Sequence, residues 1–391
     1  MRNIIPLVLL AGCVGSDSDS TVPTLADPEI RNFEQVVPSD GLPPEVVPQV
    51  SNNNLDIVHH DGRMFLAFRT APTHFASSEV VMYVVSTTDE QTWRYEGTFA
   101  QGTDLREPRL ASVNGELFLY MAILGDNAIA FEPEGTVSYK YESPGVWGPK
   151  VHWPDETFIP WRIREIEGVV YMIGYTGGEG IYDPNAEPLE ISLLTSTDGE
   201  NWEGAVADQP VVQIGGGSET DFALLDNGDL IAVTRNEQGD DFGYGSKICR
   251  APASDIGNWD CVADPKKYDS PLVFRNGDDV WLVARRNVTD TGNYDLQKDE
   301  LEPTEQYYDY QLNYWNAPKR CALWRVDPEA LEVSWVLDLP SRGDTCFASV
   351  LDTDEGLLLY NYTSDPEGPD VSWIEGQMRP TFIHRMILDL P

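Results

Sequence analysis

The sequence predicts an all-β protein, a six-bladed β-propeller built from four-stranded antiparallel blades. Three observations support this prediction: a glycine-containing turn recurs six times, an apolar strand follows each turn, and no long stretch has helical periodicity. The chain has 391 residues, of which 41% are hydrophobic, so it can fill the core of one large all-β domain.

Each repeat is marked by a tight turn that ends in glycine and lies between two strand-like runs. The six turns are Asp61-Gly62, Asn114-Gly115, Glu167-Gly168, Asn227-Gly228, Asn276-Gly277 and Glu355-Gly356. Most are of the type that joins antiparallel strands through two residues. The glycines follow one another at intervals of 53, 53, 60, 49 and 79 residues. Since about 40–50 residues suffice for one blade, six repeats predict six blades.

The run after each turn is rich in Val, Ile, Leu, Tyr and Phe, as expected of a buried strand. These strands are expected at residues 64–69, 117–122, 170–175, 230–235, 280–285 and 357–362. The longest interval contains a Tyr- and Asp-rich insertion over residues 290–314. We expect this insertion to form a loop.

The N-terminal residues have the features of a targeting segment. Arg2 is followed by an apolar run over residues 4–11, which is too short to span a bilayer. Residues 10–13, Leu-Ala-Gly-Cys, resemble the bacterial lipobox, whose cysteine is lipidated and becomes the first residue after cleavage. The alternative is an ordinary signal peptide with a chance cysteine.

These features predict the domain organisation and the location of the protein. We expect a lipoprotein signal peptide over residues 1–12, lipidated Cys13 with a flexible tether to residue 27, and the propeller over residues 28–391. The lipobox resemblance implies the cell envelope. It also implies the outer membrane, because a residue other than Asp follows Cys13.

The chain is strongly acidic, with 65 Asp and Glu against 26 Lys and Arg and a formal charge of −39. Such a surface repels nucleic acid and anionic membranes. We therefore expect no nucleic-acid partner and membrane contact through the N-terminal lipid alone. We also expect a monomer with no cofactor and no metal.

Four further cysteines suggest two disulfides, because an even number is typical of exported chains. Three pairings are possible. We prefer Cys249 with Cys261 and Cys321 with Cys346, since each pair can lie on neighbouring strands. A zinc site is the alternative, although the sequence has no CxxC spacing and no nearby His to support it.

Propeller geometry predicts where a site would lie. The innermost strand of a blade runs away from the central mouth and the second strand returns to it, so the start of one and the end of the other face the same funnel. Arg recurs at these positions in five of the six blades. The candidate substrate-binding residues are Arg69, Arg106, Arg109, Arg162, Arg235, Arg285, Trp161 and Tyr175. The planar guanidinium suits carboxylate, sulfate or sugar hydroxyls; alternatively, these arginines pair with neighbouring acids and hold the blades together.

Acidic residues lie among these arginines. A glycosidase needs two such groups, one to protonate the leaving oxygen and one to attack or to activate water. The candidate catalytic residues are Glu219, Asp104, Asp221, Asp344 and Tyr360. We expect Arg235 to keep Glu219 ionised, which suits a base or a group that activates a nucleophile.

Two further motifs have a structural meaning. Residues 86–93 and 196–202 resemble the Asp-box, a hairpin in which the Asp caps its own turn and the Trp packs between strands. The Asp-box is typical of sialidase-like propellers and carries no chemistry. Asp89, Trp93, Asp198 and Trp202 are therefore not site candidates.

Over most of residues 50–365 the chain resembles the sialidase superfamily. The segment from Ser218 to Asn236 resembles the sialidase stretch that carries a catalytic Glu and a carboxylate-binding Arg, roles that the resemblance implies for Glu219 and Arg235. The chain departs from the family at residues 51–56 and 268–271, which lack the expected arginines, and at Phe347, where the family has its nucleophilic Tyr. Residues 104–110 also resemble five-bladed hydrolases, but six repeats argue against that group.

The resemblance implies a glycan ligand or substrate. It favours a sialidase-like, exo-acting glycoside hydrolase that acts on an anionic or hydroxyl-rich glycan. The alternative is a non-catalytic surface propeller that binds glycan or protein. A polysaccharide lyase is a third hypothesis, because His59, His60 and His74 could supply the base that such a reaction needs.

Overall fold

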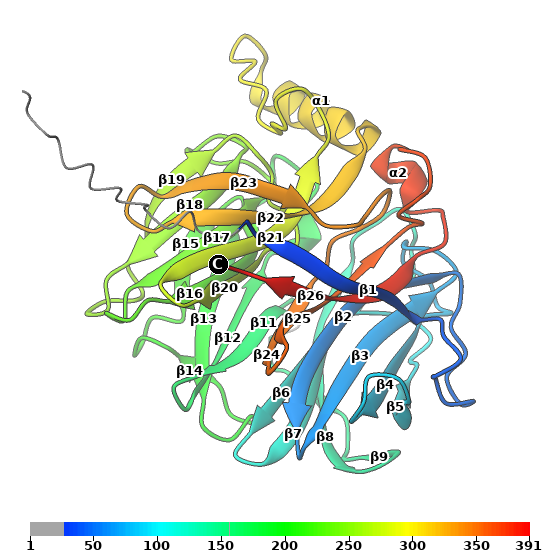
Figure 1. Ribbon diagram of the computed structural model, residues 1–391. Coiled ribbons are helices and arrows are strands. Elements are labelled where there is room, and N and C mark those ends of the chain that lie inside the picture. The colour runs from blue at the N-terminus through cyan, green and yellow to red at the C-terminus, as the bar shows by residue number, and fades with distance from the viewer. Residues whose placement is uncertain (1–26, 156) are drawn as a thin grey trace, which may run out of the picture.

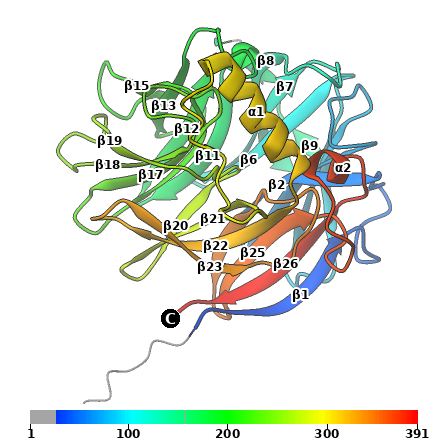
Figure 2. The ribbon, with the colours of Figure 1, turned by 90° about the horizontal axis from the view of Figure 1, so that it is seen from above.

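The computed structural model describes residues 27–155 and 157–391, which form six antiparallel sheets around a central axis (Figure 1). The view from above shows the sheets arranged as the blades of a ring (Figure 2). The predicted six-bladed β-propeller is therefore confirmed. Cys13 and the rest of residues 1–26 lie outside the described residues.

Each blade begins at the centre of the ring and proceeds outward. The innermost strands are β2 (Ser51–His60), β6 (Asp104–Val113), β11 (Ile159–Ile166), β16 (Gly217–Leu224), β20 (Leu272–Asn276) and β24 (Ser349–Thr353). The second strands are β3 (Arg63–Ala71), β7 (Glu116–Leu124), β12 (Val169–Thr176), β17 (Leu230–Asn236), β21 (Asp279–Asn287) and β25 (Gly356–Thr363). The six apolar strands expected from the sequence lie within these second strands.

The outer strands complete the blades. They are β4 (Val81–Thr87), β5 (Arg94–Phe99), β8 (Pro133–Ser143), β9 (Val146–Trp147), β10 (Val151–His152), β13 (Leu189–Ser196), β14 (Glu203–Gly204), β15 (Val211–Gly215), β18 (Ser246–Ala251), β19 (Asp260–Asp264), β22 (Lys319–Asp327), β23 (Glu332–Asp338), β26 (Phe382–Asp389) and β1 (Glu29–Val37).

The inner hairpins turn where the sequence predicts. In the first blade, Asp61 and Gly62 alone connect β2 to β3, with φ angles of 46° and 69°. Two successive positive φ angles are the signature of a tight hairpin turn whose twist matches that of its strands. Asn114 and Gly115 make the same connection in the second blade.

The last blade combines both ends of the described chain. Its outermost strand is β1, which pairs antiparallel with β26 from Glu29 opposite Asp389 to Val37 opposite Ile383 (Figure 1). Side chains support the same pairing, since Arg31 Nη2 donates to Asp389 Oδ1 at 2.8 Å. The ring is thus closed by backbone hydrogen bonds between the first and last strands.

Both predicted disulfides are present. Cys249 and Cys261 face each other on the neighbouring strands β18 and β19 of the fourth blade. The expectation that the second pair also lies on neighbouring strands was wrong. Cys321 belongs to β22 of the fifth blade, whereas Cys346 precedes β24 of the sixth, so this disulfide joins two blades.

Two outer turns are held by their own aspartates. Asp198 Oδ1 accepts hydrogen bonds from the backbone N–H groups of Glu200 and Asn201 at 2.9 and 2.8 Å. Asp89 does the same for Gln91 and Thr92 at 2.9 and 2.8 Å. These carboxylates stabilise the outer hairpins of their blades.

The expectation of a loop over residues 290–314 was wrong in part, because α1 (Pro303–Asn316) forms there. Its buried face consists of Tyr307, Tyr310, Gln311 and Tyr314, which follow helical spacing although none is aliphatic. The short helix α2 (Trp373–Gly376) lies on the same face of the ring (Figure 2). No helix in the described part of the chain is long and apolar enough to cross a membrane.

Candidate functional site

A cavity of about 500 Å³ is lined in part by Trp315 of α1 and Trp373 of α2, and so lies on the side of the ring that carries these helices. It lies where the innermost strands begin and the second strands end, as propeller geometry predicts. Its histidine, arginine and glutamate lining residues are His74, Arg106, Glu107, Glu219, Arg235 and Arg285. Its aromatic lining residues are Phe75, Phe131, Tyr175, Tyr182, Trp315, Phe347, Tyr362 and Trp373.

β-Bulges place three of the polar side chains. In β16, Ser218 and Glu219 together oppose the single residue Arg235 of β17. Similar register shifts occur in β2 at Asn54, whose φ is 38°, and in β6 at Glu107, whose φ is 50°. A bulge redirects the side chain at which it occurs, and bulges are common beside active sites. Asn54, Glu107 and Glu219 all line the cavity.

Glu219 is held between the fourth and fifth blades. Its Oε1 lies 2.8 Å from Arg235 Nη1, and its Oε2 accepts a hydrogen bond from the backbone N–H of Ser270 at 2.7 Å. Arg235 does not serve Glu219 alone, because its Nε lies 3.2 Å from Glu237 and 3.9 Å from Asp269. One guanidinium is therefore shared by three carboxylates.

This sharing determines which carboxylate takes up a proton. Asp269 has Lys267 and Arg285 as well as Arg235, and its pKa is lowered to about 2. Burial raises the pKa of Glu219 to about 7; Arg235 opposes the shift, whereas Asp269 and Glu107 add to it. The expectation that Arg235 keeps Glu219 fully ionised was therefore wrong, because burial and two neighbouring negative charges outweigh one shared arginine.

Glu107 is a second carboxyl group in the cavity. Its Oε2 accepts a hydrogen bond from Asn54 Nδ2 at 3.2 Å and lies 3.9 Å from Arg109 Nη2. Burial raises the pKa of Glu107, while Arg109 and Arg106 oppose the shift. The cavity therefore contains two carboxyl groups whose pKa values both lie above the ordinary one, as a proton donor requires near neutral pH.

Two further arginines are fixed at the wall. Arg285 donates from Nε to the carbonyl of Thr345 at 2.7 Å and from Nη1 to Asp269 at 2.8 Å. The Trp373 ring lies over its guanidinium, 4.7 Å from the ring centre. Arg106 donates to Asp104 Oδ2 and to the carbonyl of His74, at 2.5 and 2.7 Å. These contacts hold the guanidinium groups in place before any ligand binds.

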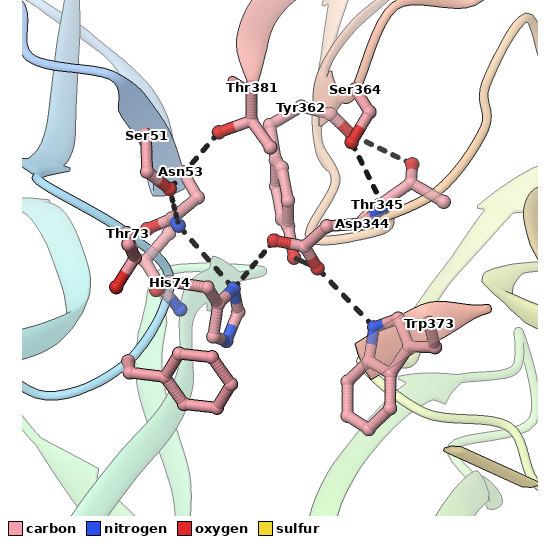
Figure 3. Close-up of polar contacts among 12 residues, drawn as sticks. Ser51, Asn53, Thr73, His74, Asp344, Thr345, Tyr362, Ser364, Trp373 and Thr381 are labelled. Atoms are coloured by element: carbon pink, nitrogen blue, oxygen red, sulfur yellow. Dashed lines mark hydrogen bonds and ion pairs between the residues drawn. The ribbon is translucent and has the colours of Figure 1, made fainter. Parts of the chain in front are cut away.

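A histidine and an aspartate meet at the wall between the first and sixth blades. Figure 3 shows the imidazole of His74 beside Asp344, with Trp373 on the other side of the carboxylate and the Tyr362 side chain reaching down to it. His74 Nδ1 lies 2.7 Å from Asp344 Oδ2. Asp344 is fully buried and does not line the cavity, whereas His74 does.

Several predicted site residues support the wall without lining it. Asp104 is fully buried and accepts hydrogen bonds from Arg69 and Arg106, so Asp104 and Arg69 match the structural alternative. Arg109 is also fully buried, between the rings of Trp161 and Phe347 at 5.2 and 4.6 Å. Trp161 is likewise buried and does not line the cavity.

Three other predicted residues point elsewhere. Arg162 lines a second cavity of about 580 Å³ at the opposite end of the ring. Asp221 binds Arg164 and the backbone N–H of Val273, which lie toward that end. The Tyr360 hydroxyl contacts Glu90 within the outer part of the blades at 3.4 Å. Placing these three side chains at the mouth was wrong, because strand position alone does not fix which way a side chain points.

The site also contains residues that the candidate set omitted. Glu107 follows Arg106 near the start of its strand. The adjacent candidates Arg106 and Arg109 were the sequence feature that could have identified it. Tyr182, Trp315 and Trp373 come from segments outside the inner strands, namely the connection after β12 and the two helices. The position of a residue along an inner strand says nothing about where such connecting segments and helices lie relative to the cavity. Within the described residues, no group of three or more His, Cys, Asp or Glu side chains is arranged to hold a metal ion.

Comparisons with known proteins place the fold. No family model matches the sequence, and no curated protein matches it either. Among solved structures, a protein of unknown function from Dyadobacter fermentans matches with a TM-score of 0.61 and 14% identity, covering 93% of this chain and 99% of that one. Trypanosoma rangeli sialidase in complex with sialic acid matches with a TM-score of 0.58 and 14% identity over 93% of this chain.

A mutant of the same sialidase that displays trans-sialidase activity matches with a TM-score of 0.57 and 15% identity. Both matches cover 59% of the sialidase chain, so this protein corresponds to somewhat more than half of that enzyme's length. At this level of identity the likeness concerns architecture. The chain is a six-bladed β-propeller whose fold is similar to the matched part of that sialidase.

Proposed function

We propose that this protein is an exo-acting glycoside hydrolase that takes an anionic or hydroxyl-rich sugar into the cavity above the ring centre. The observation that carries the proposal is Glu219, a buried carboxyl group with a pKa of about 7 that lines this cavity beside Arg235. A group that is substantially protonated at neutral pH can donate a proton to a leaving glycosidic oxygen.

The rest of the lining supports the same proposal. Arg106, Arg235 and Arg285 offer fixed cationic donors to carboxylate, sulfate or hydroxyl groups. Trp315 and Trp373 offer the flat apolar surfaces on which sugar rings stack. The fold is shared with a sialidase that binds sialic acid, an anionic sugar.

The test is a panel of 4-methylumbelliferyl glycosides and isolated polysaccharides, incubated with the wild-type protein and with Glu219→Gln. The substitution keeps the shape of the side chain and removes the proton donor. We expect loss of activity on the order of 10²-fold or more, the usual contribution of general acid–base catalysis. Glu165→Gln, on β11 at the opposite end of the ring, is the matched control and should retain full activity.

Two outcomes would contradict the proposal. Full activity of Glu219→Gln on a verified substrate would remove Glu219 from the mechanism. Binding of a glycan without cleavage by the wild-type protein would favour the non-catalytic glycan-binding propeller instead.

A further inference from the structure

His74 and Asp344 form a hydrogen-bonded pair that takes no part in proton donation by Glu219. His74 lies in the connection between β3 and β4 of the first blade, whereas Asp344 precedes β24 of the sixth. The backbone of His74 is fixed on both sides: its N–H donates to the carbonyl of Gln377 at 3.1 Å, and its carbonyl accepts from Arg106 at 2.7 Å. The imidazole is thus delivered to the cavity wall in a defined place.

We propose that His74 is a catalytic residue, a base oriented by Asp344 that removes a proton from water as the water attacks the anomeric carbon of the bound sugar. This inference rests on the proposed function, because it assigns the second half of the same hydrolysis.

Hydrogen bonding fixes which nitrogen of His74 carries the proton. Asp344 Oδ1 accepts from the Tyr362 hydroxyl at 3.0 Å and from Trp373 Nε1 at 3.3 Å, and Oδ2 faces His74 Nδ1 at 2.7 Å (Figure 3). An ionised carboxylate can only accept, so Nδ1 must donate. The approach of Asn53 Nδ2 to the same nitrogen, at 3.4 Å, is then a contact between two donors. Nε2 is left with its lone pair on a ring that lines the cavity.

The surroundings keep the imidazole neutral. Burial lowers the pKa of His74, and the positive charges of Arg106 and Arg69 lower it further, against the opposing effect of Asp344. The pKa of Asp344 is itself lowered by His74 and Arg285 despite burial. A neutral imidazole next to an ionised carboxylate is the arrangement of a general base and its orienting group.

The base acts on water in this proposal because burial disfavours ionisation of the tyrosines in the cavity, including Tyr362, whose hydroxyl donates to Asp344. Phe347 stands where the sialidase resemblance expects the nucleophilic Tyr, and it lacks a hydroxyl. Tyr175, Tyr182 and Tyr362 do line the cavity, but burial raises the pKa of each hydroxyl. Each phenol therefore stays protonated at neutral pH and is a poor nucleophile.

The proposed hydrolysis is a single displacement in which each bond formed is matched by a bond broken. The water oxygen forms a bond to the anomeric carbon as the glycosidic C–O bond breaks. The water proton passes to His74 Nε2, and Glu219 gives its proton to the leaving oxygen. Both groups then return to their starting states by exchange with solvent. The single displacement inverts the anomeric configuration.

The experiment separates the base from the acid by leaving-group dependence. The probes are the 4-methylumbelliferyl glycoside that the wild-type protein cleaves and the 2,4-dinitrophenyl glycoside of the same sugar, whose leaving group needs no protonation. We expect His74→Ala to lose on the order of 10²-fold or more on both substrates. Glu219→Gln should lose activity mainly on the methylumbelliferyl glycoside. His60→Ala is the matched control, since His60 lies on β2 and contacts Ser112 away from the cavity.

Rescue by azide distinguishes a catalytic role of His74 from a purely structural one, because azide cannot restore a damaged fold. Azide needs no base, so it should restore turnover of the dinitrophenyl glycoside by His74→Ala and give a glycosyl azide of inverted configuration. His74→Gln replaces the alanine variant if the latter does not fold. NMR of the ring nitrogens of the wild-type protein should show Nδ1 protonated and Nε2 unprotonated at neutral pH.

Three results would overturn the inference while leaving the proposed function intact. They are full activity of both His74 variants, a covalent glycosyl–tyrosine adduct trapped with a fluorinated glycoside, and a proton on Nε2 of the resting protein. Unsaturated products from a uronate polymer would overturn both the inference and the proposed hydrolysis, because the base would then remove a carbon-bound proton in an elimination. If the wild-type protein cleaves no glycoside, the proposed function fails and the catalytic role of His74 fails with it.

Discussion

The protonation of two side chains sets the pH dependence expected of the cavity. Glu219 must be protonated to act as an acid, and its pKa is raised to about 7, so activity should be present below pH 7 and fall as the pH rises through 7. His74 must be neutral to act as a base, and burial lowers its pKa below the ordinary histidine value, so activity should fall on the acid side of that value. We expect kcat/KM to follow a bell-shaped profile between these limits.

The assignment of each limb can be checked with the variants. On the methylumbelliferyl glycoside, whose leaving group needs the proton, the residual activity of Glu219→Gln should lose the alkaline limb and keep the acid limb. A profile that is unchanged in Glu219→Gln would show that another group governs the alkaline limb.

Sequence reasoning at the residue scale succeeded where strand position decides the outcome. Arg106, Glu219, Arg235 and Arg285 line the cavity because they stand at strand ends that face the mouth. It failed for the ionisation of Glu219, since that depends on how many carboxylates share Arg235. Asp269 comes to that guanidinium from the segment before β20, through the packing of two blades that no local pattern records, whereas Glu237 lies only two residues after Arg235.

At the scale of elements, turns and strands could be predicted because both are local. A two-residue turn needs Gly or Asn-like residues, and a buried strand needs apolar ones. The bulges in β2, β6 and β16 could not be predicted, because each depends on the pairing with the next strand. The helix α1 was missed because its buried face consists of tyrosines and a glutamine, which do not form an aliphatic stripe.

The two disulfides should differ in their effect on the cavity. Cys346 follows Thr345, whose carbonyl accepts the hydrogen bond of Arg285, and its bond to Cys321 ties this segment to the fifth blade. We expect the double variant Cys321→Ser/Cys346→Ser to lose about 3 kcal/mol of unfolding free energy and to raise KM, because the segment that positions Arg285 is released.

The control is Cys249→Ser/Cys261→Ser, which removes a bond within one blade. It should lose a similar free energy of unfolding in urea and leave KM unchanged. Equal KM values for the two double variants would contradict the link between the inter-blade bond and Arg285.

For the whole molecule, we propose that the propeller is held at the cell envelope through lipid on Cys13, in the segment that precedes the described residues. The acidic surface, with a formal charge of −39, would repel anionic lipid, so attachment should depend on the lipid alone. We expect Cys13→Ser to release the protein from membranes or to leave it unprocessed, as measured by detergent partitioning and by the mass of the N-terminal peptide. Unchanged partitioning of the variant would contradict the proposal.

The pairing of β1 with β26 means that the ring can close only after the last strand has been synthesised. The strand that is made first receives its hydrogen-bonding partner only when residues 382–389 have been made. A nascent chain can form its early blades, but it cannot close the ring, and β1 remains an unpaired edge that other strands or proteases can recognise. A product that stops before β26 would keep that edge permanently. The closing blade therefore distinguishes a chain that contains β26, in which β1 is paired, from a truncated chain in which β1 stays an exposed edge.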